Sequence, residues 1–324
     1  MKRLLLCLPA AWVAFGIGPN VFAQDFPTRP LRLIVPFPAG GASDVLGRIL
    51  AQKLTERLGQ QVIVDNRAGA GGSIGAEAAV RAAPDGYTLL LGSTSEIAIN
   101  PWLYGKLSYD TRKDLVPVAM FASSQMVVLV HPSLPVRAAK DLIALARARP
   151  GEINFSSAGV GTFTHLTGEL FRSATNVSLT HVPYKGAVAS MTGAVSGEVH
   201  AIFPTLTTGM PFIEAKRLRP IAVSTRARAP SLPEVPTLLE SGVRNFEVQY
   251  FWVGVFVPTG TPRDLVARLT SEIAQTLKLP DVINHLASQN ATTGNLIQAQ
   301  FADFVNAEFA IWGKAVKSSG AKAD

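Results

Sequence analysis

The sequence predicts an α/β fold of two lobes, and three observations support this. β-rich runs alternate with helical segments that carry apolar residues on one face. The same strand-loop-helix order starts a second time near residue 126, and the last third adds further helices. A chain of 324 residues is also long enough for two hydrophobic cores. We therefore expect two units, each a largely parallel sheet covered by helices.

The first unit begins with a β-rich run that ends in a glycine-rich loop. Its expected elements are a strand at 31–36, a helix at 45–58, a strand at 61–65, a turn at 69–72, a helix at 73–82 and a strand at 87–91. The second unit follows a pair of strands within 116–130. Its expected elements are helices at 140–149, 164–173 and 187–195 and strands at 153–157, 178–182, 201–203 and 219–224.

The chain then returns to the first unit. The expected elements are a strand at 248–257 and helices at 263–277, 281–288 and 298–317. This order predicts a discontinuous first lobe, 24–125 and 226–324, and an inserted second lobe, 126–225. We expect 118–130 and 221–224 to be the strands that cross between the lobes.

Residues 1–23 have the pattern of an export signal. Lys2 and Arg3 precede an apolar stretch at 4–17, and small residues stand at the positions that signal cleavage, ending at Ala23. The stretch is shorter than the roughly 20 apolar residues of a spanning helix. We therefore expect a periplasmic protein. Its mature form would lack cysteine, since Cys7 is the one cysteine in the sequence, which excludes disulfides, a thiolate nucleophile and cysteine-bound zinc.

Charge and motifs exclude further classes of function. The net charge is +7, but the basic residues are scattered and form no block with interleaved aromatics, so we expect no nucleic-acid partner. The five histidines lack metal-ligand spacing, and the glycine-rich segment 69–75 does not match G-x-G-x-x-G. We expect no metal, no cofactor and no catalytic residue, and we expect a monomer.

The candidate ligand-binding residues lie where strands end and helices begin, because loop amides and helix N-termini meet there. A tight turn with a capped helix is the alternative at each place. The candidates are Phe37, Ala39, Gly40, Gly41, Ser43 and Asp44 in one loop; Ser157, Ala158, Gly161, Thr162, Thr164 and His165 in a second; Ser93, Thr94, Ser95 and Glu96 in a third; Tyr184, Lys185 and Gly186 in a fourth; and Thr205.

The sequence resembles the receptors of tripartite tricarboxylate transporters, also called Bug-type receptors, in several motifs that occur in the same order and at the same spacing. The resemblance covers essentially the whole mature chain, at 25–30, 36–41, 66–72, 83–89, 99–101, 157–171, 181–186 and 232–237. It implies a type II periplasmic-binding-protein (Venus flytrap) fold, in which two lobes joined by a strand hinge close on a small organic acid or amino-acid-like ligand. It also implies a carboxylate held by the loops 37–44 and 157–165, and delivery to a membrane permease driven by an ion gradient.

Two departures from the family pattern leave the ligand class open. Glu96 stands where relatives have small or hydroxyl residues, and near a pocket it would repel an anion or attract an ammonium group. Pro204 removes a backbone donor. A zwitterionic or uncharged ligand therefore remains an alternative. Two other functions also remain open: a sensor that presents its closed form to a membrane signalling partner, and an exported enzyme with Ser157 or Ser93 as nucleophile and His165 as base.

Overall fold

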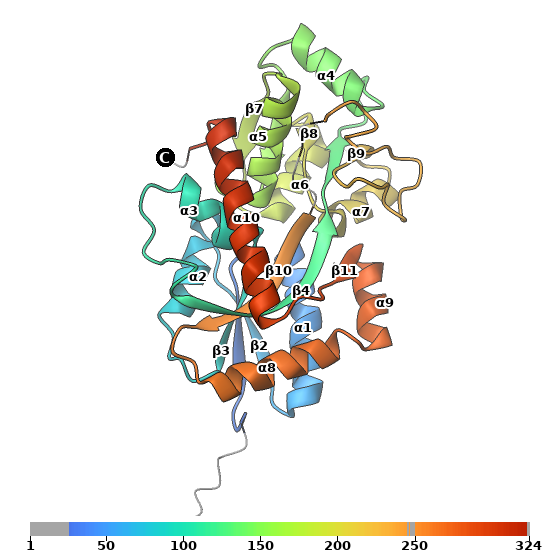
Figure 1. Cartoon of the computed structure of the whole chain (residues 1–324). Coiled ribbons are helices and arrows are strands. Elements are labelled where there is room, and N and C mark those ends of the chain that lie inside the picture. The colour runs from blue at the N-terminus through green and yellow to red at the C-terminus, as the bar shows by residue number, and fades with distance from the viewer. Residues whose placement is uncertain (1–25, 245, 247–249, 323–324) are drawn as a thin grey trace, which may run out of the picture.

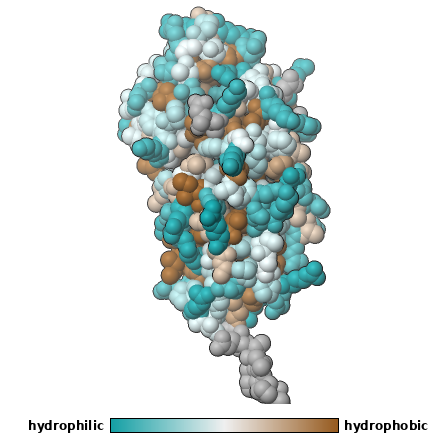
Figure 2. Space-filling model, turned by 90° about the vertical axis from the view of Figure 1, so that its left-hand side faces the viewer, coloured by the Kyte–Doolittle hydropathy of each residue, from teal (hydrophilic) through white to brown (hydrophobic). Residues whose placement is uncertain are grey.

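The computed structural model describes residues 26–244, 246 and 250–322, and these form two lobes, each built around its own sheet (Figure 1). The expected export signal lies outside the described residues. Hydrophilic and hydrophobic residues are interspersed over the face shown in Figure 2. Within the described ranges, none of the helices combines the length and the apolar character needed to cross a bilayer.

In the described part of the chain, the first lobe holds a six-stranded sheet in the order β11-β4-β10-β3-β1-β2. Its strands are β1 (Leu31–Val35), β2 (Val62–Asn66), β3 (Thr88–Ser93), β4 (Leu115–Gln125), β10 (Tyr250–Pro258) and β11 (Ala291–Thr293). The helices around it are α1 (Ala42–Leu58), α2 (Ser73–Val80), α3 (Asn100–Leu103), α8 (Arg263–Thr276) and α9 (Pro280–Ser288), with short turns η1 (Ala70–Gly72) and η2 (Thr94–Ile99). β1 is an almost continuous apolar run because both α1 and α2 pack on it.

The second lobe holds a sheet whose five described strands run in the order β7-β6-β8-β5-β9. They are β5 (Val127–Val130), β6 (Asn154–Ser157), β7 (Thr180–Pro183), β8 (Ala201–Ile202) and β9 (Arg219–Val223). Its helices are α4 (Ala139–Ala148), α5 (Phe163–Thr175), α6 (Ala187–Ser196) and α7 (Leu206–Glu214). The rings of Phe155, Phe171 and Phe203 pack together in its core, with centroids 5.3 and 5.6 Å apart.

The chain changes sheets at Met126, the residue between β4 and β5. Met126 N–H donates to Ser224 Oγ (3.1 Å), and Ser224 N–H donates to the Met126 carbonyl (3.0 Å). The outgoing chain is therefore bonded to the returning one at the crossing. β9 pairs with β5 inside the second sheet, so of the expected crossing segment 221–224 only Ser224 lies at the hinge. The exact lobe boundaries remain a prediction. Helix α10 (Gln298–Ser319) packs on both β4 and α5 and so runs along both lobes (Figure 1).

Neither sheet is largely parallel, so that expectation was wrong. Strands of the strand-loop-helix units are parallel, β1 with β2 and β3, and β6 with β7 and β8. β10 pairs antiparallel with β3 and β4, and β5 pairs antiparallel with β8 and β9. In the first sheet the antiparallel pairing follows from the insertion of the second lobe. The chain leaves the first sheet along β4 and returns to it along β10, which lies beside β4 and runs in the opposite direction. Three elements, α3, α7 and β11, were not expected from the sequence.

Candidate functional site

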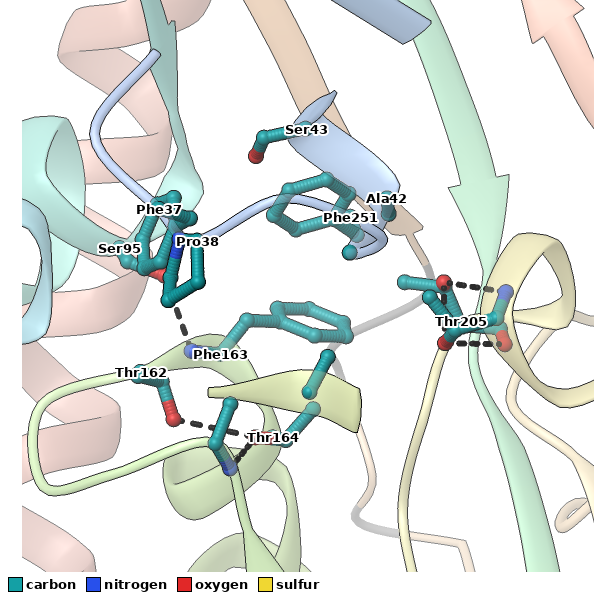
Figure 3. Close-up of a pocket in the computed structure, with 14 residues that line it drawn as sticks. Phe37, Pro38, Ala42, Ser43, Ser95, Thr162, Phe163, Thr164, Thr205 and Phe251 are labelled. Atoms are coloured by element: carbon teal, nitrogen blue, oxygen red, sulfur yellow. Dashed lines mark hydrogen bonds between the residues drawn. The ribbon is translucent and has the colours of Figure 1, made fainter. Parts of the chain in front are cut away.

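A pocket of about 60 Å³ lies between the lobes, and we call it the inner pocket (Figure 3). It is bounded by the N-terminal ends of four helices, α1 from the first lobe and α5, α6 and α7 from the second. Its lining residues are Phe37, Pro38, Gly41, Ala42, Ser43, Ser95, Ala158, Thr162, Phe163, Thr164, Ala187, Thr205, Thr208 and Phe251. None of these described residues carries a charge, so polar recognition here depends on amides and hydroxyls.

Two of the four helices begin without a side-chain cap. α1 follows Gly41 and α6 follows Gly186, and neither glycine has a side chain to accept from the first-turn amides. Within the described residues, the amides of Ala42, Ser43 and Ala187 make no hydrogen bond. Since the first N–H groups of a helix have no partner inside it, these donors are free to bind a ligand.

The other two helices are capped by threonine. Thr162 Oγ1 accepts from His165 N–H (3.4 Å) at the start of α5, and Thr205 Oγ1 accepts from Thr208 N–H (3.4 Å) at the start of α7. Thr164 Oγ1 accepts from Ala158 N–H (2.9 Å) and so holds the loop before α5 in place. These hydroxyls shape the pocket wall and satisfy local donors.

The cleft is closed in this structure, because the two lobes touch around the inner pocket. Phe163 N–H, in α5, donates to Ser95 Oγ of the first lobe (3.0 Å). A methyl group placed on Gly41 would lie 3.5 Å from Cβ of Ala187, so the starts of α1 and α6 are in near contact. Free donors from opposite lobes thus face one small space.

A second, outer pocket of about 480 Å³ adjoins the first and shares four lining residues with it. It is also lined by Tyr104, the glycine-rich turn 68–72, Gly159, Val160 and the segment Tyr184–Gly186. Lys185 is exposed there, and it supplies the cationic side chain among the described residues of either pocket.

Comparison with known proteins identifies the family. The family described as tripartite tricarboxylate transporter family receptor matches residues 46–321. The chain belongs to this receptor family. It is 36% identical to BugT of Bordetella pertussis over 323 residues, 99% of each chain. The structure of Rpa4515 of R. palustris with adipate superposes with a TM-score of 0.89 at 36% identity, over 92% of this chain and 99% of that one.

A further similar structure is MatC of Rhodopseudomonas palustris with bound malate, with a TM-score of 0.85 and 28% identity over 90% of this chain and all of that one. The matches confirm the two-lobed periplasmic-binding-protein fold predicted from the sequence. Members of this family are periplasmic solute-binding receptors. The family match therefore supports a receptor independently of the pocket.

The receptor brings together part of the predicted set of site residues. Those that line the inner pocket are Phe37, Gly41, Ser43, Ser95, Ala158, Thr162, Thr164 and Thr205. Tyr184, Lys185 and Gly186 line the outer pocket. Ala39, Gly40, Asp44, Ser93, Thr94, Glu96, Ser157, Gly161 and His165 line neither.

Asp44, which lines neither pocket, holds the adjacent loop in place. Asp44 accepts from Gly40 N–H (3.0 Å) and from Asn66 Nδ2 (3.0 Å), and it forms an ion pair with Arg48 (2.9 Å). Burial opposes its charge, but the hydrogen bonds from Arg48, Gly40 and Asn66 outweigh burial and lower the pKa of the carboxyl group. Asp44 therefore stabilises the 37–41 loop, and its negative charge is compensated by Arg48.

Glu96 is fully buried and turned toward Ser93. Its carboxyl group accepts from the Ser93 backbone N–H and from Ser93 Oγ, the latter at 2.7 Å, which makes a capping box at the start of η2. Burial raises the pKa of Glu96 to about 8, although the bonds from Ser93 oppose the shift. Glu96 lines neither pocket, and its carboxyl group is bonded to Ser93 and not directed at a ligand.

The serine-histidine pair considered for an enzyme is arranged differently from the expectation. Ser157 Oγ is 2.6 Å from Nε2 of His181, a residue that sequence reasoning did not select, and His165 stacks on His181 with ring centroids 4.1 Å apart. Burial lowers the pKa of His165 to about 3 and that of His181 to about 4, with charge effects adding to it. In the described part of the chain neither ring is hydrogen-bonded to a carboxylate, and His, Cys, Asp and Glu form no metal-binding group of three.

Sequence reasoning missed six residues that line the inner pocket: Pro38, Ala42, Phe163, Ala187, Thr208 and Phe251. Pro38, Ala42 and Phe163 lie inside the loops already selected, and Ala187 follows Gly186 directly, so their neighbours were the signal. Thr208 stands three residues after Thr205 in a helix that was not expected. Phe251 lies within a strand, where nothing local distinguishes it from a core residue.

Proposed function

We propose that this receptor binds a small molecule in the periplasm through a carboxylate group held between its lobes, and passes it to a permease of the tripartite tricarboxylate type driven by an ion gradient. The observation that carries the proposal is the pair of uncapped helices, α1 and α6, that meet from opposite lobes at the inner pocket.

Backbone amides at a helix N-terminus bind anions because the N–H groups lack partners and the helix dipole is positive there. A carboxylate has two oxygens, so it accepts from Ala42 and Ser43 of α1 on one side and from Ala187 of α6 on the other. The hydroxyl of Ser43 adds a further donor at the same space, whereas the hydroxyl of Thr208 donates to the Thr205 carbonyl. The compensation of Asp44 by Arg48 removes the nearest opposing charge on α1.

This arrangement links binding to closure. An amide of the second lobe reaches the carboxylate only when the lobes are in contact, so the ligand stabilises the closed form by the contacts that the open form lacks. The acids adipate and malate in the structures of two relatives support an anionic ligand for this member of the family.

The test is a thermal-shift screen of the mature protein against small carboxylic acids, their uncharged amides and amino acids, followed by calorimetry. A ligand at 100 times its Kd adds about 2.7 kcal/mol to the free energy of unfolding. Stabilisation by uncharged compounds and not by acids would refute the proposal.

The matched variants are Ala42→Pro and Ala42→Gly. Proline is tolerated at the first position of a helix but lacks the N–H, whereas glycine keeps it. Hydrogen bonds to charged groups contribute about 1.5–3 kcal/mol, so Ala42→Pro should weaken binding of the acid roughly ten- to hundredfold. Ala42→Gly should bind nearly as the parent does. Equal affinities of the two variants would exclude this amide from the site.

A further inference from the structure

We infer that the rings of Phe163 and Phe251 set the size of the ligand, so that the receptor selects a short-chain monocarboxylate over a longer dicarboxylate. The inference rests on the proposed function of the inner pocket as a carboxylate site. It adds the class of acid, which neither the free amides nor the family match determines.

The two rings come from different parts of the chain and meet at the inner pocket (Figure 3). Phe163 is the first residue of α5 in the second lobe, and Phe251 lies in β10 of the first lobe. Their centroids are 5.3 Å apart in an edge-to-face arrangement, a favourable geometry for aromatic pairs. Phe163 also packs edge-to-face on Trp312 of α10 at 5.9 Å. The pair therefore forms a wall that joins both lobes and α10.

This wall is fixed in place. Phe163 and Phe251 are 2% and 5% exposed. The backbone of Phe163 is bonded to Ser95 Oγ, and Phe251 is paired with Ser124 across β10 and β4. Turning either ring away would break close packing on its other side and leave a void. The rings are thus expected to limit the pocket whenever the lobes are closed.

The space left beside the wall is small. One water molecule needs about 10–15 Å³ of such volume, and an engineered cavity that binds benzene measures about 150 Å³. The inner pocket, at about 60 Å³, therefore has room for about four to six water-sized groups, which is a carboxylate and about one to three further carbon atoms. The carboxylate binds at the amides of Ala42 and Ala187, and the apolar end faces the rings. A second carboxylate would meet aromatic carbon there, at a high desolvation cost.

The competing arrangement places a second carboxylate in the outer pocket near Lys185. It predicts a different result, because a dicarboxylate would then bind through Lys185 without involving the rings. The two arrangements are separated by removing each feature in turn.

The experiment measures the Kd of propionate and of adipate by calorimetry for the mature protein, for Phe251→Ala and for Lys185→Gln. Phe304→Ala is the control, since Phe304 is an aromatic residue that packs on Trp252 (5.5 Å) and lines neither pocket of the cleft. We expect the parent to prefer propionate at least tenfold. Phe251→Ala should move the ratio at least tenfold toward adipate, and Phe304→Ala and Lys185→Gln should leave it unchanged. Phe251→Leu, a smaller change, should move the ratio in the same direction if the alanine variant does not fold.

Three results would overturn the inference while leaving the proposed function standing. The parent could bind adipate as tightly as propionate, the ratio could stay constant in both Phe251 variants, or Lys185→Gln could weaken adipate alone. Failure of the proposed function looks different, because then neither propionate nor adipate, nor any other acid of the screen, would bind.

Discussion

Gly161 offers a direct test of lobe closure. It precedes α5 in the second lobe with φ of +80°, and a methyl group placed on it would lie 2.7 Å from Oδ1 of Asn100 in the first lobe. Asn100 is fully buried, and its Nδ2 donates to the Gly71 carbonyl and to Ser73 Oγ, both at 2.9 Å. The oxygen therefore has little room to move. We expect Gly161→Ala to oppose the closed form.

The size of the effect follows from two contributions. Left-handed backbone costs a non-glycine residue about 1–2 kcal/mol, and for a protein of this size each kcal/mol lowers Tm by roughly 2–4 °C. The overlap with Asn100 adds about 1–3 kcal/mol, but only when the lobes are closed. That second contribution should weaken ligand binding roughly five- to hundredfold.

The matched control is Gly242→Ala. Gly242 has φ of +87°, and a methyl group on it would meet nothing within 4 Å. Both variants should melt at lower temperature than the parent, whereas only Gly161→Ala should bind the acid more weakly in calorimetry and remain more extended in small-angle scattering with ligand present. If the two variants bind equally, closure does not bring Gly161 against Asn100, and the reasoning is wrong.

Three further predictions concern hydrogen bonds and pH. Ser95→Ala removes the bond to the amide of α5, so binding of the acid should weaken roughly two- to tenfold in calorimetry, while Ser288→Ala, outside the cleft, should not change it. The pKa of Glu96 is raised from 4.5 to about 8, so the stability that the neutral carboxyl group contributes is complete below pH 4.5 and is lost as pH rises through 8. Between pH 6.5 and 8 the free energy of unfolding, measured with denaturant, should therefore fall by up to about 1.4 kcal/mol per pH unit, and Glu96→Gln should remove this fall. An unchanged slope in the variant would contradict a buried neutral carboxyl group. The pKa values of His165 and His181 are lowered from 6.5 to about 3 and 4, so the stability contributed by the neutral rings is present above pH 6.5 and is lost as pH falls through those values. His165→Phe should therefore lose less stability than the parent when the pH is lowered from 6.5 to 4, and an equal loss in the two proteins would refute this prediction.

Local sequence determined most of the elements. Period and composition predicted most strands and helices, because a buried strand and an amphipathic helix each leave a repeating apolar pattern. The threonine cap at Thr162 was within reach for the same reason, since capping involves residues two or three apart. In contrast, α1 begins at Ala42, three residues before the start expected from its apolar pattern. The Ser93–Glu96 capping box is equally local, and its S-x-x-E spacing could have identified Glu96 as structural.

Tertiary structure decided which of these loops face one another. The inner pocket joins Gly41 to Ala187, Ser95 to Phe163, and Phe163 to Phe251, pairs separated by long stretches of chain. No local pattern reports such contacts, because they depend on where the chain crosses at Met126 and on how far the lobes close. Phe251 shows this most clearly. In the sequence it is one apolar residue of a strand, and the closed hinge makes it a wall of the binding site.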